Sequence, residues 1–93
     1  MKINARLKTI GDLVEKDSIC LDVGCDHALL DIYLVHRKAN IKTIASDIAH
    51  GPLEQAKKNI EREHLEDVIE TRLGSGLETY TDEINTIIIS GMG

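Results

Sequence analysis

The stretch CLDVGCDHALLDIYL, residues 20–34, decides the fold of this 93-residue chain. Its apolar residues up to Val23 are typical of a buried strand, and Gly24 allows the chain to turn sharply at the strand's end. After the turn, Leu30 and Leu34 recur at helical spacing. The stretch therefore predicts a strand, a turn and a helix, which together begin a βαβ unit.

Three more apolar runs of strand length follow, at residues 41–46, 68–73 and 85–90. Helical spacing is found near the N-terminus and again over 51–65, whereas the link around GLETY, between the last two runs, is shorter. Strands that alternate with helices need crossover connections, which give a parallel sheet. We predict an α/β, Rossmann-like fold with sheet order 3-2-1-4, preceded by an N-terminal amphipathic helix. Its ligand is expected outside the carboxyl ends of the first and fourth strands, where the strand order reverses.

Composition and length fit one globular domain at most. Hydrophobic residues make up 42% and charged residues 29% of the sequence. The last predicted strand would leave an open sheet edge, so we expect residues 1–93 to form the N-terminal part of a larger domain, or to pair with a second copy through that edge. The net charge of −5 disfavours tight nonspecific binding to nucleic acid by this chain alone.

The cellular setting is expected to be the cytoplasm. The N-terminal residues lack the continuous apolar core of a signal peptide, and no apolar run is long enough to span a membrane. Cys20 and Cys25 lie on one strand and in the loop directly after it, where a disulfide between them would distort the strand. Both thiols are therefore expected to be reduced.

The turn after the first strand carries an acidic residue where dinucleotide-binding turns carry glycine. A dinucleotide fold needs G-x-G-x-x-G, but here the sequence reads Asp22-Val-Gly24-Cys-Asp26-His-Ala28. The carboxylate of Asp26 would repel a pyrophosphate, so NAD is disfavoured. S-adenosylmethionine carries an ammonium and a sulfonium and has no phosphate, and acidic residues favour such a cation. We therefore predict S-adenosylmethionine as the cofactor.

The ends of the other strands supply further candidate contacts. Asp47 follows the second strand, where a carboxylate can accept hydrogen bonds from both ribose hydroxyls. The third strand ends in the small residues GSG, 74–76, against which an adenine ring can lie, with Ser75 available for a polar contact. The fourth ends in SGMG, 90–93, where the glycines permit a target group to approach closely.

Four segments, DVGCDHALLDIYL, SDIAHGPLEQAKKNI, RLGSGLE and IIISGMG, resemble in order those of the bacterial tRNA (adenine-N1) methyltransferases of the TrmK type, which modify adenine 22. The resemblance covers nearly the whole chain. DHA in the glycine loop, GP-x-x-x-A at a helix start and the terminal GMG are together more specific than any one of them. Members of that family continue with the rest of a methyltransferase sheet and a helical C-terminal domain, so the resemblance implies that tRNA binding needs a region beyond this chain.

Residue by residue, the resemblance implies a cofactor site and a place for the target base. The cofactor-binding residues would be Asp22, Gly24, Cys25, Asp26, His27, Ala28, Asp47, Ile48, Gly74, Ser75, Gly76 and Gly91. The target base would lie beside residues 91–93. Among the departures from the family's usual residues, Leu29 replaces a tyrosine, Asp31 a proline and Ser75 an acidic residue. Proline and aspartate both favour the first turn of a helix, so Asp31 is expected to be tolerated there.

The implied reaction is an in-line transfer, in which N1 of adenine attacks the sulfonium methyl and the protein supplies alignment and a suitable electrostatic setting. Because N1 faces its pairing partner in a helix, the adenine must be unpaired or flipped out. The candidate catalytic residues are Asp26, His27 and Met92. Asp26 would stabilise the developing positive charge or accept a proton, with His27 as the second candidate. No metal is expected, because adjacent residues such as Cys25, Asp26 and His27 cannot readily converge on one ion.

Other readings of these residues stay open. Asp26 can instead cap the helix, His27 can order the loop through a hydrogen bond, and Met92 can serve as packing. The function also has alternatives, namely a methyltransferase of another substrate and a noncatalytic cofactor-binding module.

Overall fold

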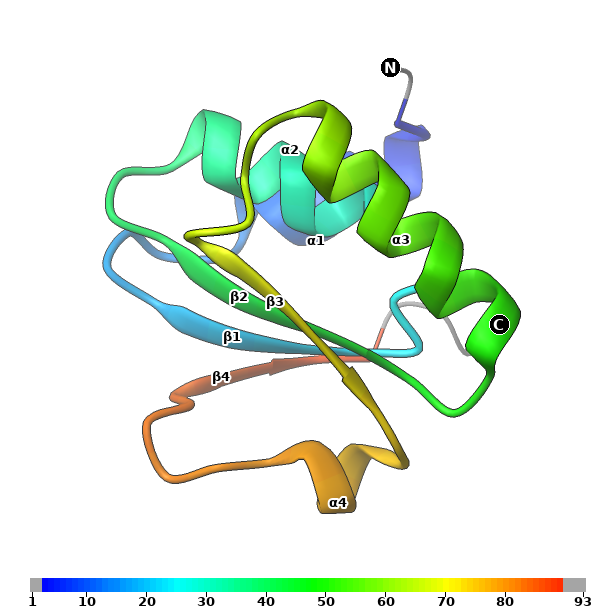
Figure 1. Ribbon diagram of the computed structural model, residues 1–93. Coiled ribbons are helices and arrows are strands. Elements are labelled where there is room, and N and C mark those ends of the chain that lie inside the picture. Colours follow the sequence, from blue (N-terminus) through cyan, green and yellow to red (C-terminus); the bar gives the residue numbers. More distant parts are fainter. Residues whose placement is uncertain (1–2, 90–93) are drawn as a thin grey trace.

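A four-stranded parallel sheet with the order β3-β2-β1-β4 forms the centre of the computed structural model, which describes residues 3–89 (Figure 1). In chain order the elements are α1 (Ala5–Asp12), β1 (Ile19–Val23), α2 (Leu29–Arg37), β2 (Lys42–Asp47), α3 (His50–Arg62), β3 (Ile69–Leu73), α4 (Gly76–Thr79) and β4 (Thr86–Ile88). The predicted α/β, Rossmann-like class, the strand order and the N-terminal helix are all confirmed.

The strand register brings the carboxyl ends of β1, β2 and β3 to one edge of the sheet. Val23 of β1 lies opposite Ser46 of β2, and Asp47 of β2 lies opposite Leu73 of β3. The loops that leave these three strands are therefore neighbours in space, although they are far apart in the sequence. This edge is where the candidate site residues meet.

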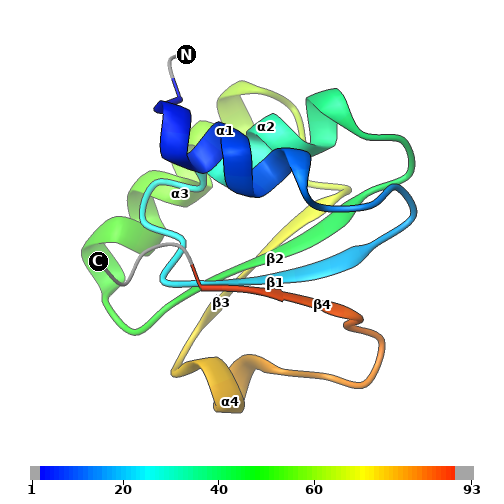
Figure 2. The same cartoon turned by 180° about the vertical axis from the view of Figure 1, so that it is seen from behind.

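Helices α1, α2 and α3 cover one face of the sheet, and α1 lies beside α2 (Figure 2). Two groups of buried apolar side chains fill this layer, one beneath α2 and α3 and one between α1, α2 and β4. Gly11 allows the two helices to approach, since a Cβ there would lie 3.0 Å from the Tyr33 ring. The Tyr33 hydroxyl donates a hydrogen bond to Asp12 Oδ1 at 2.9 Å, which fixes the α1–α2 contact.

The opposite face of the sheet is covered less completely. Leu21, Ile44 and Ile84 form a small core there, beside the single turn of α4. The apolar sequence of β4 and the residue after it is typical of a strand covered on both sides, but of these isoleucines only Ile88 is buried, while Ile87 and the following Ile89 are exposed. The reason is that α4 spans only four residues and is too short to cover β4. None of the helices within residues 3–89 is long and apolar enough to cross a membrane.

Candidate functional site

In the β1–α2 loop, residues 24–28, every second residue has a left-handed backbone conformation. Gly24, Asp26 and Ala28 have positive φ angles of 70°, 54° and 61°. The left-handed region costs a residue with a side chain about 1–2 kcal/mol, so Asp26 and Ala28 occupy positions that glycine would fill more easily. Ala28 is the residue preceding α2, and no side chain caps this helix. The reading of Asp26 as a helix cap is therefore wrong, because the N-cap position is Ala28 and Asp26 lies two residues before it, in a left-handed conformation.

Three hydrogen bonds join this loop to β2 and α3. The Cys25 N–H donates to the Ser46 carbonyl at 2.9 Å. The Asp26 N–H donates to Asp47 Oδ2 at 3.3 Å, and Asn59 Nδ2 of α3 donates to the His27 carbonyl at 2.9 Å. Because β2 and α3 both contribute, the strained loop is fixed by its surroundings rather than by its own sequence.

Asn59 is a site residue that the sequence analysis missed. It is 8% exposed and lies on the buried face of α3, among apolar residues that include Ala56 and Ile60. A buried polar side chain needs a hydrogen-bond partner, so an asparagine on an apolar helix face is itself a signal that it binds a backbone group of a neighbouring segment. The sequence shows that asparagine, but only the tertiary structure identifies the His27 carbonyl as its partner.

Asp47 lies between the β1–α2 loop and the end of β3. Its Oδ1 accepts a hydrogen bond from the Ala49 N–H at 3.0 Å, and its carbonyl accepts one from the Gly74 N–H at 2.9 Å. Its Oδ2 is the acceptor for the Asp26 N–H described above. A carboxylate has about four acceptor positions, so Asp47 keeps capacity for the hydroxyls of a ligand.

The edge of the sheet is acidic. The Asp26 side chain is 74% exposed, and its Oδ1 lies 3.7 Å from Nε2 of the half-exposed His27 ring. Asp22 and Asp31 lie behind the loop and are buried, with exposures of 1% and 0%. An exposed carboxylate and Asp47 at the same edge favour a cationic ligand over a phosphate.

The two cysteine thiols do not provide a nucleophile here. Burial, followed by the charges of Asp31 and Asp22, raises the pKa of Cys20 to about 11. The same causes raise the pKa of Cys25 well above its ordinary value, and its side chain is buried in the core beneath α2 and α3. A thiol with a raised pKa is protonated near neutral pH and reacts poorly.

The end of β3 offers small residues and exposed apolar side chains. A Cβ at Gly76 would lie 3.2 Å from both Val23 methyl groups, so α4 begins in close contact with β1. The Ser75 hydroxyl caps α4, and the Ser75 N–H donates to Glu78 Oε1 at 3.0 Å. Ile48 is 75% exposed and Leu73 is 49% exposed. These two side chains lie near Asp47 and can cover a flat apolar ring; Leu73 was not identified from the sequence.

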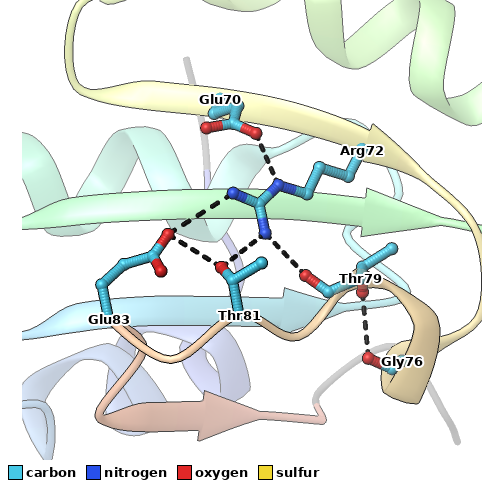
Figure 3. A network of polar contacts seen from close by, with 6 residues as sticks. All are labelled: Glu70, Arg72, Gly76, Thr79, Thr81 and Glu83. Atoms are coloured by element: carbon cyan, nitrogen blue, oxygen red, sulfur yellow. Dashed lines mark hydrogen bonds and ion pairs between the residues drawn. The ribbon is translucent and has the colours of Figure 1, made fainter.

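Arg72 of β3 holds α4 in place (Figure 3). Its Nη1 donates to the Thr79 carbonyl at 2.7 Å and to Thr81 Oγ1 at 2.8 Å. The guanidinium also forms ion pairs with Glu70 and with Glu83, the latter at 3.5 Å. The network fastens the C-terminal end of α4 and the residues after it to β3, a contact that the sequence pattern did not predict.

The N-terminus of α1 also borders the β1–α2 loop. A cavity of about 130 Å³ lies between them, lined on the α1 side by Asn4, Arg6 and Leu7 and on the loop side by residues that include Asp26 and His27. The Asn4 side chain caps α1 by accepting a hydrogen bond from the Leu7 N–H at 2.9 Å. The first helix thus contributes to the site as well as to the core.

The predicted residues at the end of the fourth strand, Gly91 and Met92 among them, lie outside the described residues. Within residues 3–89, no group of histidine, cysteine, aspartate or glutamate side chains is arranged to hold a metal ion. The structure thus brings together the predicted residues from β1, β2 and β3.

The fold and this acidic edge define a class of protein. A family model described as a methyltransferase domain matches residues 3–93, and the chain belongs to this family. The chain is similar to the tRNA (adenine(22)-N(1))-methyltransferase of Bacillus subtilis (strain 168), with 35% identity over 94 residues that cover 100% of this chain and 40% of that protein.

Solved structures of similar proteins have the same fold as this chain. A Streptococcus pneumoniae protein, described as a candidate tRNA (m1A22) methyltransferase and solved in complex with S-adenosyl-L-methionine, is 41% identical with a TM-score of 0.90, covering 99% of this chain and 44% of its own. TrmK of M. capricolum, in complex with S-adenosyl-homocysteine, is 33% identical with a TM-score of 0.84, covering 94% of this chain and 40% of its own. The resemblance to the TrmK type is confirmed, and the chain spans less than half the length of these relatives.

Proposed function

We propose that residues 1–93 form the N-terminal, cofactor-binding part of an S-adenosylmethionine-dependent tRNA methyltransferase that modifies N1 of adenine 22. The observation that carries this proposal is the hydrogen bond between the Asp26 N–H and Asp47 Oδ2. It joins the acidic β1–α2 loop to the carboxylate at the end of β2, so the two parts of a nucleoside site form one unit. The similar proteins solved with S-adenosyl-L-methionine and S-adenosyl-homocysteine support the same assignment.

The residues at this edge fit the parts of such a cofactor. Asp47 would accept hydrogen bonds from the ribose hydroxyls, and Ile48, Leu73 and the backbone of residues 74–76 would border the adenine. The β1–α2 loop, with the carboxylate of Asp26, would hold the cationic amino acid part.

S-adenosylmethionine, when bound, supplies an electrophilic methyl group. The chain's own contribution is alignment, since the loop is fixed by bonds to β2 and α3 before any ligand arrives. The exposed carboxylate of Asp26 can stabilise the positive charge that adenine gains on N1 methylation or accept a proton from its exocyclic amine. The half-exposed ring of His27 can support the same role.

Partners and setting are part of the proposal. The relatives are more than twice as long as this chain, which supports a tRNA-binding region outside residues 1–93. The open edge of β4, with exposed Ile87 and Ile89, would be covered by further polypeptide or by a second copy of the chain. The two free cysteines are compatible with a reducing, cytoplasmic setting.

Calorimetric titration tests the cofactor assignment. Circular dichroism first establishes that the chain is folded, and it is then titrated with S-adenosylmethionine, S-adenosylhomocysteine and NAD. The two sulfur compounds should bind and NAD should not. Asp47→Ala should weaken binding by about tenfold or more, corresponding to the loss of about 1.4 kcal/mol from charged hydrogen bonds, whereas the exposed Asp67→Asn should have no effect.

The substrate needs a separate measurement. Bacterial tRNA and labelled S-adenosylmethionine are incubated with the chain and with a relative of full length, and the modified nucleoside is mapped. Label at N1 of adenine 22 supports the proposed reaction. Label at another atom supports a methyltransferase of another substrate, and cofactor binding without transfer by this chain supports a cofactor-binding module that needs the missing region.

A further inference from the structure

A pair of buried carboxyl groups lies behind the β1–α2 loop. Asp22 of β1 is 1% exposed, and Asp31 in the first turn of α2 is 0% exposed. Asp31 therefore occupies the helix position that the sequence predicts, but its side chain points into the core instead of meeting the helix dipole in solvent. A fully buried carboxyl group needs either a partner or a proton.

Three carboxyl oxygens of this pair accept no hydrogen bond from the described residues. Asp22 Oδ1, both carboxyl oxygens of Asp31 and Thr43 Oγ1 are buried without a hydrogen-bond partner within residues 3–89. The two carboxyl groups are close enough to bond to one another. Two ionised carboxylates cannot do so, since each is only an acceptor. A proton shared between Asp22 and Asp31 is therefore the donor that the arrangement requires.

The electrostatic surroundings keep that proton in place. Burial, followed by the charge and hydrogen bond of Asp31, raises the pKa of Asp22 well above its ordinary value. Burial raises the pKa of Asp31, although the neighbouring Asp22 carboxyl and Thr43 hydroxyl act in the opposite direction. The thiols of Cys20 and Cys25 face the pair from β1 and the loop, and both stay protonated because their pKa values are raised as well.

The buried pair interacts electrostatically with the carboxylates at the ligand edge, the edge of the sheet where β1, β2 and β3 end. The carboxylate of Asp47 raises the pKa of Asp22, and Asp22, Asp31, Asp47 and Asp26 together raise the pKa of Cys25 in the loop. These groups therefore lie within electrostatic reach of one another. A positive charge placed on the β1–α2 loop would offset that repulsion and favour the ionised pair.

We propose that Asp31 is a positioning residue that shares a proton with Asp22, so that binding of a cationic ligand on the β1–α2 loop releases this proton. The pair gains one negative charge, and the buffer takes up the proton. This inference rests on the proposed function, with S-adenosylmethionine as the cation. By linkage, affinity for the ligand rises with pH by up to about tenfold per pH unit while the proton is being lost.

Calorimetry in two buffers measures the released proton. The folded chain is titrated with S-adenosylmethionine at pH 6, 7 and 8 in phosphate and in Tris, whose ionisation enthalpies differ, and the difference in observed heat gives the number of protons. Asp31→Asn keeps the shape of the side chain but cannot ionise, and the exposed Asp67→Asn is the matched control. The ligand's own amine contributes equally in all three proteins, so the difference between them isolates the buried pair.

The native chain and Asp67→Asn should release more protons than Asp31→Asn, and only the first two should bind more tightly as pH rises. Equal proton release in the native chain and Asp31→Asn, with binding intact, would overturn the inference and leave the proposed function standing. Release of no proton by the native chain at any of the three pH values overturns it even if the variant does not fold. A folded native chain that binds no S-adenosylmethionine at any pH overturns both.

Discussion

Replacing Arg72 with alanine should lower the free energy of unfolding by about 2 kcal/mol. Arg72 Nη1 donates to the carbonyl of Thr79, the last residue of α4, and to the hydroxyl of Thr81 (Figure 3). A carbonyl at a helix end has no partner within its own helix, so Arg72 satisfies a group that would otherwise need water. Removing the guanidinium frees the connection between β3 and β4.

The magnitude follows from the exposure of the groups. A hydrogen bond to a charged group contributes about 1.5–3 kcal/mol when buried, but the Arg72 side chain is 20% exposed. We therefore take about 1 kcal/mol for each of the two bonds at 2.7 Å and 2.8 Å. The ion pairs with the exposed Glu70 and Glu83 are left out of the sum, because solvent screens such pairs.

Urea denaturation followed by circular dichroism measures the change, and thermal unfolding should show a fall of about 10 °C in Tm for a domain of this size. Arg72→Lys keeps the charge but cannot present two donors at a fixed angle, so it should recover less than half of the loss. Lys57→Ala removes an exposed ion pair of α3 and serves as the control. A loss in Arg72→Ala no larger than that in Lys57→Ala would refute the reasoning, and full recovery in Arg72→Lys would show that charge alone matters.

Three further predictions concern the loop, the buried acids and the glycines. Asp26→Gly should raise the free energy of unfolding, measured in urea, by about 0.5–1 kcal/mol, since φ is 54° at this exposed residue. Asp26→Asn should leave it unchanged. A lower free energy of unfolding in the glycine variant would contradict the strain argument. Because the pKa values of Asp22 and Asp31 are raised, the folded chain keeps a proton that the unfolded chain has lost, so stability should fall as pH rises above the ordinary carboxyl pKa of about 4. Asp31→Asn should flatten this dependence in urea titrations between pH 5 and 8, and an unchanged slope would count against a protonated pair. Gly76→Ala should lower the free energy of unfolding by about 1–3 kcal/mol, because its Cβ would lie 3.2 Å from the Val23 methyl groups. A Cβ at Gly51 in α3 would have nothing within 4 Å, so Gly51→Ala should raise the free energy of unfolding by about 0.5–1 kcal/mol. Equal Tm values for the two variants would refute the packing argument.

The sheet and its ligand edge could be predicted because they depend on local patterns. Strand-length apolar runs separated by helical spacing require crossovers, and crossovers fix both the parallel sheet and its order. The position of Asp47 at the strand end follows directly from that order. Residues such as Gly24 could be assigned for the same reason, since the turn must come where the first strand ends.

The contacts that hold the site depend on partners far away in the sequence. Asn59 bonds to a carbonyl 32 positions earlier in the chain, and no local pattern specifies that partner. Arg72 binds groups in a connection whose path is set by the one-turn helix α4. The burial of Asp31 could not be predicted from the sequence either, because a residue in the first turn of a helix can face either solvent or core, and the packing of α2 on the sheet decides which.

The left-handed geometry of the β1–α2 loop explains how an acidic turn can replace a glycine-rich one. Gly24, Asp26 and Ala28 all keep positive φ angles, although only the first is a glycine. The cost of the other two is met by hydrogen bonds to Ser46, Asp47 and Asn59, which lie outside the loop. In return, position 26 carries a carboxylate at the ligand edge that glycine would not provide. The same substitution, Asp26→Gly, should therefore make the chain more stable and bind a cationic cofactor more weakly, and a variant that improved both properties would show that the carboxylate has no part in binding.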